Sequence, residues 1–312
     1  MKRKTQIKVI GIGGAGGNIV SRIYKSNPPK QIEVIALNAD LQDLKEAKAN
    51  QKLQIGRKIT RGFGAGMDPK IGRMAATESK EEIKNLLGSP DIIFLLAGLG
   101  GGTGSGALPV VAKLAKETEA LTLGIVTSPF YFEGEKRKQI AKRTLPILEE
   151  NLDALIVVSN DKILPKEENS SLNIDSAFFL VDKIIQDIIF GILDILIRPG
   201  LINIDLADLN SILKGAKRAF FGIGHAKGEN RVEEAVDMAL NSPFLENSFE
   251  GAKNILFNVS GGRKLTLFDV EKIAKIIQKK ASLQAKIIFG AIQDEKLFKE
   301  DEVKILLIGG NL

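Results

Sequence analysis

Two glycine-rich segments constrain the fold of this 312-residue chain more strongly than any other feature. Residues 11–18 (GIGGAGGN) come at the end of the apolar run 7–12, and residues 98–106 (GLGGGTGSG) come directly after the apolar run 91–97. A helix-like pattern follows each glycine segment. A short apolar strand, a glycine turn and a helix form the repeating unit of an α/β protein. We therefore predict that both segments join a strand to a helix in one parallel sheet.

The rest of the first half repeats this alternation, which predicts a parallel sheet with helices on both faces. The expected strands are Ile7–Ile12, Glu33–Leu37, Asp91–Ala97, Leu121–Thr127 and Ala154–Ser159, and the expected helices are Asn18–Lys25, Ala107–Thr118 and Lys136–Asn151. The second half predicts a smaller α/β domain. Its expected strands are Ala219–Gly224, Asn254–Val259, Ala285–Ile292 and Val303–Ile308, and its expected helices are Arg231–Leu240 and Asp269–Lys280.

A long apolar segment separates the two halves. The helix expected over 175–197 is apolar on nearly all sides, with Phe178 and Phe179 among its apolar residues, and Pro199-Gly200 ends it. A helix that is hydrophobic all round is buried, which places it between two domains. A polar loop is expected over 162–173. The predicted organisation is a first domain at 1–173, a central helix at 174–200 and a second domain at 201–312.

The composition excludes several classes of function. Without cysteine the chain has no disulfide, thiolate zinc site or catalytic thiol, and its single histidine, His225, argues against a histidine triad or metal cluster. No apolar run of about 18 residues is long enough for a transmembrane helix. No secretory signal precedes the first strand. A cytoplasmic protein is therefore expected.

The net charge of +6 leaves two alternatives for the start of the chain. The first thirty residues contain no acid and seven bases, which are Lys2, Arg3, Lys4, Lys8, Arg22, Lys25 and Lys30. Such a segment can attract anionic lipid or nucleic acid. It can equally be an ordinary solvated surface, which is the interpretation we favour. No nucleic-acid partner is expected.

The two glycine segments also carry the chemistry. The first fits the dinucleotide fingerprint with Gly11, Gly13 and Gly16, but such a match alone also fits a structural turn or a nicotinamide oxidoreductase. The second has six glycines in nine residues, which we interpret as an anion nest and not as packing, with Thr103 and Ser105 as added donors. Two such loops predict a binding site in which a polyphosphate is contacted from two sides. Neither contains the lysine of a Walker loop, which excludes a P-loop enzyme.

Residues 100–106 match the signature of the tubulin superfamily, and the whole chain resembles the FtsZ family, the bacterial and archaeal cell-division GTPases. The supporting motifs occur in the family's order across residues 5–310. They are residues 61–72 (RGFGAGMDPKIG), 127–134 (TSPFYFEG), 199–208 (PGLINIDLAD), 228–231 (GENR), 265–270 (LTLFDV) and 287–291 (IIFGA). The resemblance implies a tubulin/FtsZ-like α/β fold. Its parts are a Rossmann-like parallel-sheet GTP-binding domain, a long buried central helix and a smaller, GTPase-activating C-terminal α/β domain.

The resemblance further implies a site for GTP or GDP with Mg²⁺, the ion being held on the phosphates mostly through water, and K⁺ is a second candidate ion. The implied contacts are Gly13, Gly14, Ala15, Gly16 and Asn18 for the phosphates; Asn38 and Asp40 near the γ-phosphate and Mg²⁺; Gly64, Ala65 and Gly66 for the γ-phosphate; Gly98, Gly100, Gly101, Gly102, Thr103 and Gly104 around the phosphates; and Glu133 and Arg137 for the ribose and neighbouring phosphate.

Recognition of guanine is implied for Asn160, Phe178 and Asp182. A carboxylate can accept hydrogen bonds from guanine N1 and N2 together, an aromatic ring can stack on the base, and an amide can meet the purine edge. Adenine has no such donor pair, so Asp182 would select GTP. The alternatives are an ordinary helix charge for Asp182 and a core position for Phe178.

Residues 203–208 carry the implied catalysis. On the residues alone, Asp205 fits a helix N-cap and Asp208 fits an acid of the first turn. In the family this loop enters the nucleotide pocket of the next subunit, so Asn203, Asp205 and Asp208 are implied as catalytic, with the acids polarising the attacking water. The partner is then a second copy in a head-to-tail filament. The expected location is the cytoplasm at the division site.

Departures from the family keep a second function open, that of a low-turnover structural or regulatory filament. Asp68 follows Met67 where the family has a small residue and Asn, which adds a negative charge near the polyphosphate, and Ala39 replaces a common Thr. The family is also usually acidic. The sequence stops at Leu312, where the family continues to a peptide that binds membrane tethers. A shortened chain and a tailless paralogue are the alternatives, so tether recruitment is left open and membrane contact is expected to be indirect.

Overall fold

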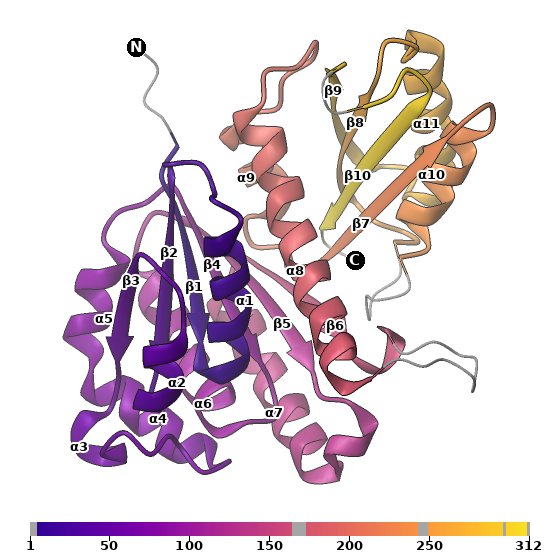
Figure 1. Ribbon diagram of the computed structural model, residues 1–312. Helices are drawn as coiled ribbons and strands as arrows, with labels where there is room; N and C mark the ends of the chain where they lie inside the picture. The colour runs from indigo at the N-terminus through magenta and orange to yellow at the C-terminus, as the bar shows by residue number, and fades with distance from the viewer. Residues whose placement is uncertain (1–4, 164–172, 243–248, 296–297, 311–312) are drawn as a thin grey trace. The chain divides into compact units, whose positions relative to one another are not determined.

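The computed structural model describes residues 5–163, 173–242, 249–295 and 298–310 (Figure 1). The chain forms two compact units, Met1–Gln186 and Asp187–Leu312. Lys2, Arg3 and Lys4 of the basic start, and most of the predicted loop over 162–173, lie outside the described residues. The boundaries predicted for the domains and the central helix stay a prediction.

The first unit contains a parallel sheet of six strands in the order β3-β2-β1-β4-β5-β6. The strands are β1 (Ile7–Ile12), β2 (Ile32–Asn38), β3 (Gln51–Gln54), β4 (Ile92–Gly98), β5 (Leu121–Ser128) and β6 (Ala154–Ser159). Residues 92–97 of β4 are buried without alternation, as expected of a strand covered on both faces. The parallel α/β architecture predicted for this half is therefore confirmed. Strand β3 was missed because only Leu53 in it is both apolar and buried.

Helices fill the connections of this sheet (Figure 1). They are α1 (Gly13–Lys25), α2 (Leu41–Glu46), α3 (Arg57–Thr60), α4 (Pro69–Glu78), α5 (Lys80–Leu87), α6 (Gly102–Lys116) and α7 (Glu135–Asn151), with short 3₁₀ turns at Tyr131–Glu133 and Asp161–Ile163. Helix α1 packs on β1, β2 and β4, and α6 packs on β4 and α4. Both α1 and α6 begin inside their glycine segments, about one turn earlier than predicted.

The second unit has a mixed sheet in the order β7-β10-β8-β9, with β10 antiparallel to both neighbours and β8 parallel to β9. The strands are β7 (Lys217–Lys227), β8 (Asn254–Gly261), β9 (Lys286–Gln293) and β10 (Glu302–Gly310), and the helices are α9 (Leu206–Leu213), α10 (Arg231–Leu240) and α11 (Leu267–Lys280). Helix α10 packs on β7 and β10. The smaller α/β domain predicted for this half is confirmed.

Helix α8 (Ile174–Ile197) leads from the first unit into the second. The prediction that it is buried on all sides is wrong for its first turns, because Phe178 is 41% exposed and Phe179 is 48% exposed. Both aromatic rings nevertheless have partners. Phe178 meets Phe130 edge to face at 5.2 Å, and Phe179 lies under the guanidinium of Arg22. The aromatic side chains at these two positions thus lie at the surface of the first unit and not in its core.

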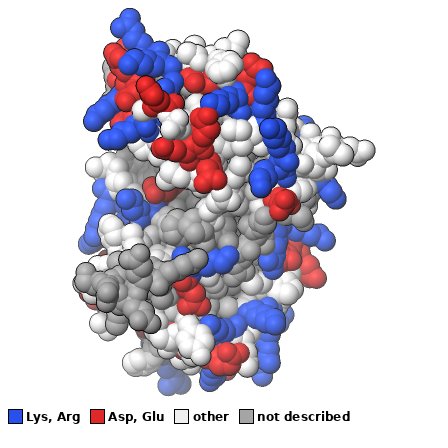
Figure 2. Space-filling model, turned by 90° about the vertical axis from the view of Figure 1, so that its right-hand side faces the viewer, with Lys and Arg blue, Asp and Glu red and all other residues white. Residues whose placement is uncertain are grey.

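The surface carries both signs of charge. Figure 2 shows Lys and Arg side chains interspersed with Asp and Glu over the viewed face. Of the basic residues near the start, Lys8 pairs with Glu33 at 3.3 Å and Arg22 pairs with Asp182 at 2.7 Å. Within the described residues no helix combines the length and the apolar character that a membrane crossing requires.

Candidate nucleotide-binding site

The two glycine segments meet at one pocket of the first unit, which has a volume of about 470 Å³. It lies where the carboxyl ends of β1 and β4 lead into α1 and α6. Strands β1 and β4 are neighbours, and their connections leave in opposite directions along the sheet. Such a switch in strand order is the usual binding crevice of an open α/β sheet. The volume is within the range of small-molecule sites.

The structure brings most of the predicted nucleotide contacts to this pocket. Its lining includes Gly13, Gly14, Ala15, Asn38, Asp40, Gly64, Ala65, Gly66, Gly98, Gly101, Gly102, Thr103, Gly104, Glu133, Arg137, Asn160 and Phe178. Four predicted residues are not part of this lining, namely Gly16, Asn18, Gly100 and Asp182. Asn18 lines an adjoining hollow of about 280 Å³, which it shares with Gly14 and Asp43.

The interpretation that the second glycine segment does not serve packing is wrong for part of it. A Cβ on Gly104 would lie 2.4 Å from the carbonyl oxygen of Gly98, and one on Gly106 would lie 2.2 Å from the carbonyl oxygen of Pro69. These glycines let the backbones of α4, α6 and the loop touch. At Gly101, by contrast, a Cβ would meet no atom within 4 Å. Gly101 therefore faces open space in the pocket, as an anion-binding position requires.

Ser105 also differs from its predicted role as a donor toward the ligand. Its side chain is buried, and its Oγ accepts a hydrogen bond from the backbone N–H of Gly100 at 2.8 Å. Gly100 itself has a φ of 98°, a conformation that favours glycine. Ser105 thus fixes the shape of the loop from behind. Thr103, at the start of α6, lines the pocket with the backbone N–H groups of that helix end.

A second loop, residues 63–67, also lines the pocket and packs against Gly102 of the second glycine segment. Asp40 caps α2 by accepting from the backbone N–H groups of Gln42 and Asp43, and it pairs with Phe63 across an isolated β-bridge. This bridge places Gly64, Ala65 and Gly66 on the pocket wall. A Cβ on Gly64 would lie 3.3 Å from Oδ2 of Asp40. Asp40 and the loop of Gly64, Ala65 and Gly66 are therefore one connected structure.

Asp68 of this loop has a local structural role. Its Oδ1 accepts from the backbone N–H of Lys70 at 2.8 Å, which makes it the N-cap of α4 with Pro69 in the first position. Asn is an equally good N-cap, so an Asn at this position would also be able to cap α4. Met67 has a φ of 61° and lines the pocket. We further predict that the added negative charge of Asp68 weakens GTP affinity or alters the rate of hydrolysis.

Sequence reasoning missed Asp43, which lines the pocket beside the first glycine loop. Its Oδ2 lies 3.1 Å from the place where a Cβ on Gly14 would stand. Burial is the largest cause that raises the pKa of the Asp43 carboxyl, with the negative charge of Asp40 next and that of Glu46 smaller, while a hydrogen bond from Asn38 lowers it. Asp43 follows the N-cap Asp40 by three residues, and this spacing was the clue in the sequence.

Glu133 and Arg137 form an ion pair at the rim of the pocket, with 3.1 Å between Oε2 and Nη1. Glu133 Oε1 also accepts from the backbone N–H of Phe130 at 2.9 Å. This bond closes the 3₁₀ turn at Tyr131–Glu133 and presents the carboxylate at the start of α7. The pair offers one acceptor and one cation to a ligand, which fits a ribose hydroxyl and a phosphate.

Asn160 and Phe178 both line the pocket. Asn160 is buried and its Oδ1 has no hydrogen-bond partner among the described residues. A buried acceptor without a partner is costly, so it favours a bound group that donates to it. Phe178 stacks edge to face on Phe130 and exposes the rest of its ring to the pocket. Asp182 lies one helical turn beyond Phe178, is 8% exposed and binds Arg22.

The predicted catalytic residues belong to the second unit. Asp205 and Asp208 form a capping box at the start of α9, in which Asp205 Oδ1 accepts from Asp208 N at 2.9 Å and Asp208 Oδ2 accepts from Asp205 N at 3.0 Å. Asn203 Oδ1 accepts from Gly200 N at 2.7 Å. The capping geometry expected from the residues alone is therefore present. The carboxylates of Asp205 and Asp208 each have one further oxygen that takes no part in the capping bonds. Leu201, which comes shortly before them in the chain, is 73% exposed.

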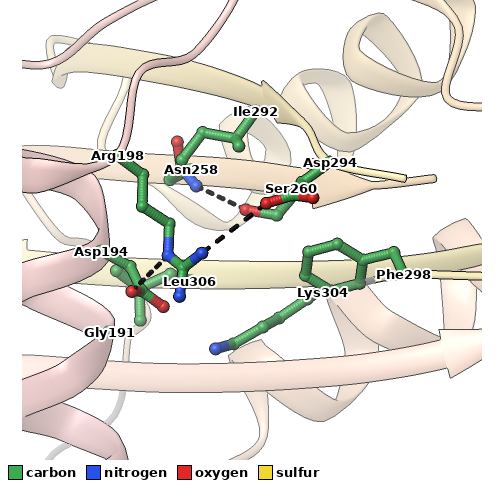
Figure 3. Close-up of a pocket in the computed structure, with 10 residues that line it drawn as sticks. All are labelled: Gly191, Asp194, Arg198, Asn258, Ser260, Ile292, Asp294, Phe298, Lys304 and Leu306. Carbon is green, nitrogen blue, oxygen red and sulfur yellow. Dashed lines mark hydrogen bonds and ion pairs between the residues drawn. The ribbon is translucent and has the colours of Figure 1, made fainter. Parts of the chain in front are cut away.

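The second unit also contains a small cavity of about 30 Å³ (Figure 3). Arg198 extends between Asp194, at 2.7 Å, and Asp294, at 3.7 Å, and Asn258 donates to Ser260 beside it. The cavity has room for about two water molecules. It is too small for a nucleotide, so the pocket of the first unit is the candidate site.

The oxygen donors at the pocket fit Mg²⁺, which prefers carboxylates, amide oxygens, water and substrate phosphates. Asp40, Asp43 and Asn38 supply such oxygens beside the phosphate loop. Among the described residues, no cluster of three or more acidic or histidine side chains could hold a metal ion by itself. A site made of one or two carboxylates, phosphates and water agrees with this arrangement.

The parallel sheet and the pocket formed by its two glycine loops define a nucleotide-binding α/β protein of the tubulin type. A model of the Tubulin/FtsZ family GTPase domain matches residues 6–166, and a model of the FtsZ family C-terminal domain matches residues 217–311. The chain belongs to the FtsZ family and is a GTPase of that family.

Solved structures agree along the whole chain. An empty FtsZ dimer of M. jannaschii is 39% identical, with a TM-score of 0.89, covering 99% of this chain and 89% of that one. GDP-bound monomeric CetZ1 of Haloferax volcanii is 23% identical with a TM-score of 0.83, covering 99% and 94%. GTPγS-bound CetZ2 of the same organism, in a protofilament, is 20% identical with a TM-score of 0.81, covering 98% and 93%. At these identities the two CetZ proteins establish a common fold.

Proposed function

We propose that this protein assembles head to tail into filaments, completes its GTPase site between neighbouring copies and serves cell division. The observation that carries the proposal is a set of exposed aromatic side chains at the pocket: Phe63 lines it, and Tyr131 and Phe132 lie in the chain between the lining residues Pro129 and Glu133. Phe63 is 85% exposed, Tyr131 is 78% exposed and Phe132 is 60% exposed. Soluble monomers rarely gather large apolar side chains on one surface, and such patches mark protein interfaces. A second copy covering these side chains would bury the rings and enclose the nucleotide.

The nucleotide would be contacted at three places, which are its base, its ribose and its phosphates. Asn160, Phe178 and Asp182 would contact guanine, and Glu133 with Arg137 would contact the ribose and a phosphate. The N-termini of α1 and α6 point backbone N–H groups at the polyphosphate. Mg²⁺ bound on the phosphates would neutralise charge that develops during phosphoryl transfer. Asp40 and Asn38 would supply oxygen atoms on the side of the site where this ion binds.

The attacking water would be oriented by acids of the next copy. Asp205 and Asp208 are held by their mutual cap, so their remaining oxygens have fixed directions. Asn203 fixes the backbone of the preceding loop. Phosphoryl transfer is catalysed mainly by positioning and charge, which rigid acids of this kind supply. The FtsZ of M. jannaschii in a dimer and CetZ2 in a protofilament support self-association as a property of relatives.

The decisive experiment measures GTP hydrolysis and light scattering in one cuvette over a series of protein concentrations with Mg²⁺. Turnover per subunit should rise above a threshold concentration together with scattering. Tyr131→Ser, which removes an exposed ring outside the pocket lining, should raise that threshold for both readouts. The matched control is Met238→Ser, which removes an exposed apolar side chain from α10. Turnover that is linear in protein from the lowest concentration would contradict the proposal.

A second outcome of the same experiment would favour the alternative function. Scattering without phosphate release would identify a low-turnover filament, the alternative that Asp68 and Met67 in the γ-phosphate loop leave open. Substituting Asp68→Asn keeps the cap of α4 and removes the charge. If hydrolysis then appears, the charge of Asp68 is the cause of low turnover.

The division role needs an experiment in cells. A fluorescent fusion expressed at native level should form a band at the division site, in the cytoplasm at the membrane. Depletion should give enlarged cells without septa. Filaments spread along the cell, with normal division after depletion, would assign the protein a different cytoskeletal role.

A further inference from the structure

Arg22 makes the closest charged contact to the predicted guanine reader. Its Nε lies 2.7 Å from Oδ2 of Asp182, and the residues are 160 positions apart in sequence. Arg22 comes from the last turn of α1, the helix whose first turn forms the phosphate loop. One helix therefore connects the predicted phosphate site with the predicted base site.

Asp182 has little access to water. Burial raises the pKa of its carboxyl above the usual value, and the hydrogen bond and charge of Arg22 act in the opposite direction. A neutral carboxylic acid has only one hydroxyl donor and a weaker carbonyl acceptor, so it cannot accept two hydrogen bonds from guanine N1–H and N2–H as a carboxylate does. Keeping Asp182 ionised and oriented is thus a condition for reading guanine.

Arg22 is itself fixed by a second contact. The carbon of its guanidinium lies 4.6 Å from the centre of the Phe179 ring, a cation–π distance. Phe179 is the neighbour of Phe178, which lines the pocket, and Asp182 follows Phe178 by four residues on the same face of α8. The stacked arginine and the base-facing residues are therefore parts of one rigid cluster. Lys can reproduce this arrangement only in part, because its ammonium keeps the positive charge but lacks the planar fork of the guanidinium.

We propose that Arg22, stacked on Phe179, is a positioning residue that holds the Asp182 carboxylate in the orientation that discriminates guanine from other bases. The ion pair uses Oδ2 through Nε, and an ionised carboxylate has lone pairs left on both oxygens for the base. Arg22 therefore supports recognition without competing with it. This inference rests on the proposed role of Asp182 in guanine binding.

The experiment compares the dissociation constants of GDP and IDP for the full chain with Mg²⁺. IDP lacks the N2 amine of guanine and is otherwise the same ligand. The native protein should prefer GDP by about tenfold or more, as charged hydrogen bonds do. Arg22→Met should bring the ratio close to one with little change in IDP binding. Arg22→Lys should restore part of the ratio, and Phe179→Leu should lower it less than Arg22→Met.

Two further variants separate the inference from the proposed function. Asp182→Asn tests the base reader itself, and Lys25→Met is a matched control that removes a neighbouring charge of α1. In the Asp182→Asn background, Arg22→Met should have no further effect on the ratio. If Asp182→Asn leaves the ratio unchanged, the base-recognition part of the proposed function fails. If Asp182→Asn lowers the ratio but Arg22→Met keeps it, or weakens GDP and IDP equally, the role of Arg22 alone is overturned.

Discussion

Asp208 combines a structural bond with the proposed catalytic role, and the two can be separated. Asp208→Ala should lower GTP hydrolysis by about 100-fold, as removal of an electrostatic or acid–base group does, while GTP affinity changes little. It should also cost about 1 kcal/mol of stability, because half of the capping box is lost. Phosphate release, nucleotide titration and thermal unfolding measure the three effects.

Asp208→Asn is the matched variant, because its amide oxygen can still accept the cap bond from Asp205 N. It should keep the native stability and share the hydrolysis defect. Hydrolysis near the native rate in both variants would show that Asp208 only caps α9. Loss of GTP binding in both would show that it maintains the fold.

Asp43 should oppose nucleotide binding when Mg²⁺ is absent. Its carboxylate lies beside the phosphate loop, and two unit charges at about 4 Å repel by roughly 1 kcal/mol in water. Asp43→Asn should therefore strengthen GDP binding severalfold in EDTA and less with Mg²⁺. The pKa of Asp43 is raised, so the charge, and the gain from removing it, is present above that pKa and disappears as the pH falls through it. Titrations at a series of pH values measure this.

The control for Asp43 is Glu46→Gln, which removes a charge on the same helix from the adjoining hollow. It should change GDP affinity less. An equal gain from both variants would assign the effect to general charge and not to the position of Asp43.

Sequence reasoning named most residues of the pocket because the glycine loops are contiguous in the chain. It missed Asp43, whose approach to Gly14 depends on how α2 packs beside α1. It also misjudged Gly104 and Gly106, since a glycine that admits a ligand and one that admits a neighbouring backbone look alike in a sequence. Only the positions of β4, α4 and α6 in three dimensions separate the two cases.

At the scale of helices and strands, Arg231 ties α10 to α11. It donates to Asp269 Oδ2 at 3.0 Å and to the carbonyl oxygens of Gly228 and Lys264, and both charged side chains are nearly buried. Asp269 is also part of the box that caps α11 with Thr266. Arg231→Met should lower stability by about 3 kcal/mol, because it leaves a largely buried carboxylate without its charged partner.

Two measurements test this prediction: urea unfolding of the protein, and hydrogen exchange of the backbone amides of α10 and α11. Arg263→Met is the matched control, because Arg263 pairs with Glu295 at 3.8 Å on the exposed surface. An exposed pair contributes roughly 0–1 kcal/mol. Equal midpoints for the two variants would refute the structural role of the Arg231–Asp269 pair.

The elements were largely predictable because buried strands and amphipathic helices have strong periodicity. Helices α1 and α6 begin earlier than expected because glycine, although a poor helix former, occupies the first turn of each helix; Gly13 itself, where α1 begins, has a positive φ of 75°. The mixed pairing of β10 with β7 and β8 could not be read from the sequence, since alternation fixes the faces of a strand but not the direction of its neighbours.

For the whole molecule, the proposal that two copies share one GTPase site makes a prediction about mixtures. Gly101→Leu should fold, since Gly101 has an extended φ of −93° and its Cβ direction is open, but the leucine side chain would occupy the space that we propose for a phosphate. Asp208→Ala has an intact pocket and lacks an acid. Each variant alone should be nearly inactive. Mixed in equal amounts, about a quarter of head-to-tail contacts would pair an intact pocket with an intact Asp208. GTP turnover should therefore reappear on mixing and grow with total protein concentration. A mixture as inactive as its components would place the complete catalytic site within one copy.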